Sequence, residues 1–216
     1  MEKFIRLYQR SILLSSLLLI VASLYSQKEN SNFTYHIREA LSTIAIDGVA
    51  DDVAWQEADL ASDFHQVLPM DTGRALVQTE VKMLYDDKNV YLLAVNYKAD
   101  DKPLMVESLR RDFNFGKNDN FLVFIDPFDD LTNGFTFGSN ARGAQWDGLL
   151  FEGGKADLSW ENKWTSAVKV YEDRWVVEMA IPFKTLRYKK GITQWGINFS
   201  RLDLQASEKS AWAPVP

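Results

Sequence analysis

Past residue 40, the chain is a succession of short β-branched and aromatic runs, separated by turn residues at intervals of about ten residues. Residues 79–85 alternate, with Val81 and Met83 on one face and polar side chains on the other, as in a half-buried strand. Residues 90–97 are almost continuously apolar, which is typical of a central strand. This rhythm predicts an all-β sandwich or barrel of about nine strands.

The other apolar runs follow the same logic. The run at 121–125 must end at Asp126-Pro127, because proline cannot donate to a sheet ladder. Two further runs flank Glu172-Asp173 closely enough to form a hairpin. The remaining strands are predicted at residues 121–125, 166–171, 174–181 and 194–202.

Helix is scarce in this pattern. Two turns are predicted for residues 51–58, capped by Asp51, and one turn for residues 183–187. Residues 210–216 have neither a strand nor a capped-helix pattern, so we expect a loop that exposes Trp212. This segment is either a short tail or the start of a missing C-terminal region, and both interpretations stay open.

Composition excludes several function classes. The 216 residues include no cysteine and only two histidines, His36 and His65, and the formal net charge is −6. Disulfides, a thiolate nucleophile and Cys-ligated zinc are impossible, and a multi-histidine metal site is disfavoured. Nucleic acid is not expected as a partner, because phosphate binding needs a basic surface.

The N-terminus has the pattern of a secretory signal peptide. Lys3, Arg6 and Arg10 precede an apolar and serine-rich run at 12–22, and small residues offer cleavage points before Gln27. An uncleaved anchor is the alternative. We expect an exported bacterial protein, located in the periplasm, at the cell surface or at the outer membrane. The predicted organisation is a signal peptide at 1–26, a polar leader at 27–39, one domain at 40–212 and a tail at 213–216.

Five blocks of the sequence occur in order: Ile46-Asp47-Gly48 with Ala54-Trp55, then residues 79–91, 118–126, 175–182 and 195–201. Together these blocks resemble family-nine carbohydrate-binding modules. The resemblance implies a jelly-roll-like antiparallel β-sandwich related to the DOMON group, which binds sugars and often holds structural calcium. Further similarity at 111–113, 133–140 and 182–187 points to the branch found at the N-terminus of long envelope proteins with a C-terminal β-barrel-like region.

Aromatic side chains are the candidate sugar contacts, because pyranose rings stack on flat aromatic faces. Trp55, Trp175 and Trp195 lie in strand or helix patterns and are expected in the core. Better candidates near turns are Trp146, Trp160, Trp164 and Trp212.

The resemblance places Trp212 where sugar-binding members have a ligand-facing tryptophan. The second tryptophan of those members is replaced here by Gly116, so Phe113 or Phe115 is the expected opposite wall. Trp212 could instead pack against the sandwich end, and Arg111 could form an ion pair. The expected rim hydrogen-bonding residues are Arg111, Asp112 and Asn118.

Acidic turns offer oxygen ligands for calcium. Asp126, Asp129 and Asp130 form the best local group, because the bend at Pro127 could bring their oxygens together. The alternative is that these aspartates only cap their own turns.

The predicted function is therefore a non-catalytic module that binds a glycan in polysaccharide use. A structural or interaction domain is the alternative. A glycoside hydrolase would need a carboxylate pair, and the DOMON kinship allows a haem domain with ligands among His65, Met70 and Met83. The candidate hydrolase carboxylates are Glu80, Glu152, Glu161 and Glu178.

Overall fold

The computed structural model describes residues 33–71, 73–152 and 154–214. The predicted signal peptide and the first part of the polar leader lie outside these residues. The chain divides into two compact units, Met1–Thr34 and Tyr35–Pro216, and the second unit contains the fold described below. Among the described residues, no helix has the length and apolarity needed to cross a membrane.

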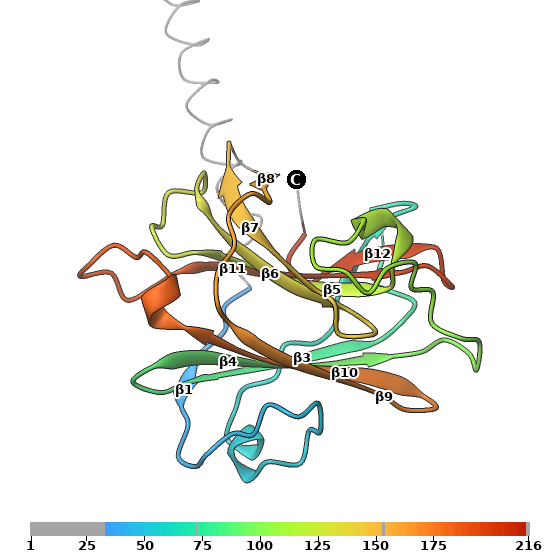
Figure 1. The fold of residues 1–216 in the computed structure, drawn as a ribbon, viewed down its shortest axis with the longest axis horizontal. Helices are drawn as coiled ribbons and strands as arrows, with labels where there is room; N and C mark the ends of the chain where they lie inside the picture. The colour runs from blue at the N-terminus through green and yellow to red at the C-terminus, as the bar shows by residue number, and fades with distance from the viewer. Residues whose placement is uncertain (1–32, 72, 153, 215–216) are drawn as a thin grey trace, which may run out of the picture. The chain divides into compact units, whose positions relative to one another are not determined.

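Two β-sheets form the two layers of the second unit (Figure 1). Neighbouring strands are antiparallel, except that β1 and β3 pair in parallel. The five-stranded sheet has the order β1 (Arg38–Glu39), β3 (Thr79–Tyr85), β4 (Asn89–Tyr97), β10 (Arg174–Pro182) and β9 (Thr165–Val170). The seven-stranded sheet has the order β2 (His65–Leu68), β12 (Glu208–Ala211), β11 (Gly196–Asp203), β5 (Asn120–Asp126), β6 (Gly134–Asn140), β7 (Gln145–Phe151) and β8 (Lys155–Asp157).

The sandwich prediction is confirmed, and the structure corrects its details. The described residues form twelve strands rather than about nine, because β1, β2, β8 and β12 are too short to show a sequence period. The predicted helix at 51–58 is a 3-10 turn, η1 (Val53–Gln56). It begins after Asp52 rather than Asp51, and without a side-chain cap. Two further 3-10 turns are η2 (Phe115–Lys117) and η3 (Phe183–Thr185).

The core lies between the inner faces of the two sheets. The predicted central strands β4, β5 and β10 supply it, with Leu92, Val123 and Val177 all buried there. A second apolar cluster covers the outer face of the five-stranded sheet, where Ile44 and Trp55 pack on the sheet's side chains. The segment before η1 is therefore part of the folded domain.

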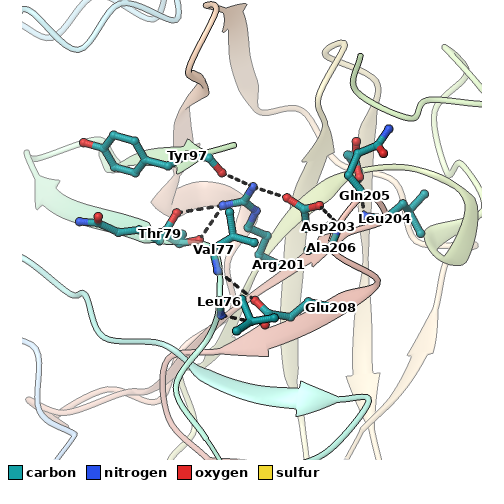
Figure 2. Close-up of polar contacts among 12 residues, drawn as sticks. Leu76, Val77, Thr79, Tyr97, Arg201, Asp203, Leu204, Gln205, Ala206 and Glu208 are labelled. Carbon is teal, nitrogen blue, oxygen red and sulfur yellow. Dashed lines mark hydrogen bonds and ion pairs between the residues drawn. The ribbon is translucent and has the colours of Figure 1, made fainter. Parts of the chain in front are cut away.

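A buried polar network around Arg201 joins the two sheets (Figure 2). The guanidinium of Arg201, in β11, is 1% exposed and donates to the carbonyls of Gln78 and Tyr97 in the opposite sheet. It also pairs with Asp203 at 2.7 Å, while nearby Glu208 accepts the backbone N–H of Leu76 at 2.8 Å. Burial lowers the pKa of Arg201, and the carboxylates around it oppose that shift. The network marks the face of β11 that points into the sandwich.

Candidate functional site

The segment at residues 105–118, here called the Arg111 loop, contains most of the predicted sugar-contact residues. Buried asparagine amides hold it in place. The Asn118 side chain accepts the N–H of Glu107 at 2.9 Å and donates to the carbonyl of Asn114 at 2.8 Å. Asn140 of β6 donates to the carbonyl of Ser108 at 2.7 Å. The predicted rim role of Asn118 is therefore wrong, since its side chain is buried and anchors the loop.

The Phe113 side chain packs on the outer face of the seven-stranded sheet. It is 3% exposed and packs in a cluster with Leu122, Ala144 and Trp146. The prediction that Phe113 forms a wall of a binding site is wrong, because the ring is used to attach the loop to the sheet. The cluster fixes the loop on a rigid surface.

Phe115 lies at the edge of the same cluster and keeps part of its ring in solvent. Its carbonyl accepts the Asn120 amide at 2.9 Å, so the backbone below the ring is fixed. Lys209 of β12 places its ammonium nitrogen 5.6 Å from the ring centroid. Phe115 is therefore a partly exposed aromatic ring with the Lys209 cation over it, so an apolar contact and a hydroxyl partner lie at one place.

Arg111 forms an ion pair with Asp147 of β7, the alternative that the sequence left open. The guanidinium also donates to Gln145 Oε1 at 2.8 Å and to the carbonyl of Asn162 at 3.2 Å. Burial raises the pKa of Asp147, and the positive charge of Arg111 opposes that shift. The Arg111 side chain is 30% exposed, so one side of it faces solvent while the rest holds the loop against β7.

Asp112 adopts an unusual backbone conformation, with φ of 55°. Its N–H donates to the carbonyl of Gln145 at 2.9 Å, and its Oδ1 is buried without a hydrogen-bond partner. Burial raises the pKa of this carboxyl, an effect that Arg111 partly offsets. A strained residue with an unsatisfied acceptor is the kind of feature that concentrates at binding sites.

Trp212 does not face the Arg111 loop. Its ring packs against Phe199 at 5.6 Å and edge-on against Tyr35 at 6.4 Å, and it is only 7% exposed. Phe199 shares the inner face with Arg201, whereas Ser200 pairs with Leu122 on the outer face beneath Phe113. Trp212 and the two phenylalanines are thus on opposite faces of one sheet and cannot form a clamp.

The expectation of an exposed loop at 210–216 is also corrected, because β12 extends to Ala211. The burial of the other tryptophans also differs in part from the prediction. Trp55 and Trp175 are in the core as predicted, but Trp195 is only half-buried. Trp146 and Trp164 are buried, and Trp160 is half-buried against Phe135 at 5.2 Å.

The turn at Asp126 is capped by its own carboxylate. Asp126 accepts the N–H of Phe128, Asp129, Asp130 and Leu131 at 2.8 to 3.0 Å. Asp130 accepts those of Thr132 and Asn133, both at 2.8 Å. No group of three or more acidic or histidine side chains suited to a metal ion occurs within the described part of the chain. Calcium at Asp126, Asp129 and Asp130 stays a prediction, and the observed bonds are those of turn capping.

Two of the four candidate hydrolase carboxylates, Glu178 and Glu152, have separate structural tasks. Glu178 is fully buried and accepts the N–H of Gly48 at 2.9 Å and the indole N–H of Trp55 at 3.0 Å. Glu152 pairs with Lys155 on the surface. Burial raises the pKa of Glu178, but the segment before η1 covers it. These residues do not form an accessible acid and base pair.

Four contributors to the Arg111 loop were not predicted: Gln145, Asp147, Asn162 and Lys209. Each lies far from the loop in sequence. The pairing of β7 and β12 in the sheet brings Gln145, Asp147 and Lys209 to the loop, and the connection after β8 brings Asn162. A buried aspartate within a strand, as Asp147 is in β7, was the one available signal. Such a residue needs a partner, because an unpaired buried charge is costly.

Comparison with solved structures shows related sandwiches. A protein from Bacteroides uniformis proposed to bind carbohydrate superposes with a TM-score of 0.63 at 14% identity, over 83% of this chain and 88% of that one. A family 9 carbohydrate-binding module from Caldicellulosiruptor kristjanssonii, solved with cellotriose, has a TM-score of 0.53 at 18% identity, over 81% of each chain. The same organism's family 9 module solved with glucose has a TM-score of 0.55 at 18% identity, over 81% of this chain and 83% of that one.

No curated protein sequence matches this chain. The sequence profile of the carbohydrate family 9 binding domain-like family matches residues 46–212, which covers nearly the whole described domain. Together with the two-sheet architecture, this match shows that the chain belongs to the carbohydrate family 9 binding domain-like family.

Proposed function

We propose that this chain is an exported, non-catalytic carbohydrate-binding module that holds a glycan at the open edge of the Arg111 loop. The sugar ring stacks on the exposed part of Phe115. Lys209 binds the hydroxyls of this ring, and the solvent-facing sides of Arg111 and Asp112, which lie beside β7 four strands away from β12, bind another part of the glycan. The module serves polysaccharide use by keeping the protein on its substrate.

One observation carries this proposal: the Phe115 ring is partly exposed yet fixed. The loop is held by asparagine amides from below and by Phe113 on the sheet, so the aromatic face loses little freedom when a ligand binds. Loop aromatics on a rigid β-scaffold are typical binding elements. Two family 9 modules of the same fold, solved with cellotriose and with glucose, support a sugar as the ligand.

A non-catalytic role is supported by the carboxylates. A glycosidase needs two of them about 5 to 10 Å apart on either side of an accessible bond. Glu178 is buried under η1, and Glu152 is engaged by Lys155. Export is supported by the basic residues and apolar run of the first 26 residues.

Calorimetric titration of the chain with cellotriose and glucose tests the proposal. F115A should weaken binding about fivefold, because an aromatic contact contributes roughly 1 kcal/mol. The matched control is F151A, since Phe151 is also a partly exposed phenylalanine but lies at the end of β7. Affinity should fall in the first variant only, with the melting temperature kept in both.

Two results would overturn the proposal. If neither these sugars nor a panel of polysaccharides binds, the structural or interaction domain becomes the better assignment. If reducing ends are released from a polysaccharide, and the release stops on changing one glutamate, the module is an enzyme.

A further inference from the structure

A basic segment stands out on this acidic chain. The connection from β10 to β11, here called the β10–β11 loop (residues 183–195), carries Lys184, Arg187, Lys189 and Lys190 and no acidic residue. The chain as a whole has a net charge of −6. This loop is therefore locally positive, although the chain as a whole is negative.

These four cations are free to meet a ligand. All four are exposed, and none takes part in the eight ion pairs found among the described residues. Hydrogen bonds from Asn133 and Thr132 lower the pKa of Asp130, and the charge of Lys189 adds to that effect without forming an ion pair with it. The cations thus lack internal partners that a ligand would have to displace.

Aromatic rings lie within the same loop. Tyr188 is 50% exposed, and its ring centroid is 5.8 Å from that of Trp195, with the planes tilted by 37°. Trp195 contacts Phe183 edge-on at 6.3 Å. Trp195 is half-buried and contacts the Tyr188 ring, so this aromatic pair lies in the same loop as the four cations.

The loop is tied to the domain at three points. The N–H of Phe183 donates to the carbonyl of Lys88 at 2.8 Å, and that of Lys189 to the carbonyl of Pro127 at 3.1 Å. The Asn162 amide donates to the carbonyl of Thr185 at 3.2 Å. Accordingly the loop lies at the same end of the sandwich as the turn between β5 and β6 (Figure 1). These bonds hold the backbone from which the cationic side chains extend.

We propose that the β10–β11 loop is a second sugar-contact surface, selective for polysaccharides that carry carboxylate or sulfate groups. The Tyr188 ring stacks on a sugar face, and the surrounding cations bind the anionic substituents. Arg187 suits this task because its planar guanidinium matches the oxygens of a carboxylate or a sulfate. The inference rests on the proposed function and adds a ligand class to it.

A glycan fits this surface better than an anionic membrane does. Surface-bound membrane segments are amphipathic helices with a broad apolar face. Here the exposed apolar contribution is one tyrosine ring with a polar hydroxyl, on a loop without helical periodicity. Flat aromatic faces ringed by polar groups are instead suited to sugars.

Dextran sulfate, alginate and uncharged dextran of similar length are the probes. The chain should bind at least one of the two anionic polymers more tightly than dextran, and salt should weaken that binding. K184Q/R187Q/K190Q should weaken it about tenfold, because three exposed ion pairs of ordinary strength add up to one power of ten. Y188A should weaken it further without lowering the melting temperature, since the ring is half exposed.

The control is R142Q/K155Q/K169Q, which removes the same charge from three exposed positions outside the loop. If both triple variants lose the same affinity for the anionic polymers, the net charge of the chain explains the binding and the proposal is overturned. It also fails if neither anionic polymer binds, or if phosphatidylglycerol vesicles displace alginate from the loop. Cellotriose binding in K184Q/R187Q/K190Q reports separately on the Arg111 loop, so the failure of one site is distinguishable from failure of the other.

Discussion

The interior of the sandwich and the edge of β7 use arginine in opposite ways. On the inner face, Arg201 is buried and its donors are taken by Asp203 and by carbonyls of the opposite sheet. At the edge of β7 that β8 leaves unpaired, Arg111 pairs with Asp147 but remains 30% exposed. The first arginine joins two layers of the scaffold, whereas the second holds a loop and keeps one side for solvent. Burial, rather than residue type, decides which arginine can contact a ligand.

The largest expected effect is on the inner face. R201M should lower the free energy of unfolding by about 4 kcal/mol, because it leaves a buried carboxylate without its partner. Urea denaturation at pH 7 measures this loss. R201M/D203N should lose less than R201M alone, since the second change removes the unpaired charge. A loss below about 1 kcal/mol in R201M would show that Arg201 is not part of the scaffold.

R111M tests the edge of β7 and should lower the free energy of unfolding by about 2 kcal/mol at pH 7, less than R201M because the site is partly solvated. Without Arg111, the pKa of buried Asp147 rises further above its unfolded value. The folded state then holds that proton while the unfolded chain releases it, so stability falls as the pH rises through this interval. Urea denaturation at pH 4 and pH 7 should show the larger deficit at pH 7. Equal deficits at both values would contradict the pairing.

D112N should stabilise the protein by up to about 1 kcal/mol at pH 7, because asparagine tolerates a positive φ and carries no charge to bury. Burial holds the pKa of Asp112 above its ordinary value of 3.8. The gain should therefore vanish below that value, where both states are protonated. D119N is the matched control and should destabilise, since the Asp119 carboxylate accepts two backbone N–H groups at 2.6 and 2.7 Å. A stability loss in D112N would show that its carboxylate is satisfied.

The smallest effect is expected at Thr136, whose hydroxyl is buried on the outer face without a partner. T136V should change the free energy of unfolding by less than about 1 kcal/mol, and in the stabilising direction. Thr79 on the inner face is equally buried, but its hydroxyl oxygen accepts from Arg201 at 3.2 Å. T79V should therefore destabilise, and melting temperatures of the two variants compare the faces directly. Similar decreases in melting temperature in T136V and T79V would contradict this difference between the two hydroxyls.

Long strands could be predicted from sequence because a period of two or a continuous apolar run shows in seven or more residues, as in β3 and β4. β12 could not be predicted, since four residues carry no period. Phe113 and Phe115 are close in sequence and do lie together, yet their orientations differ. The orientation of Trp212 depends on the register between β11 and β12, which no local pattern specifies. The ion pair of Arg111 was foreseen as an alternative, but Asp147 was not foreseen as its partner.

Mapping backbone amide chemical shifts during a cellotriose titration tests the central claim most directly. If the Arg111 loop is the binding surface, the largest shifts should occur at residues 105–118 and at Lys209, with little change around Trp212. F115A should suppress those shifts while the rest of the spectrum stays folded. Shifts concentrated at Trp212 and Tyr35, or on the five-stranded sheet, would contradict the account.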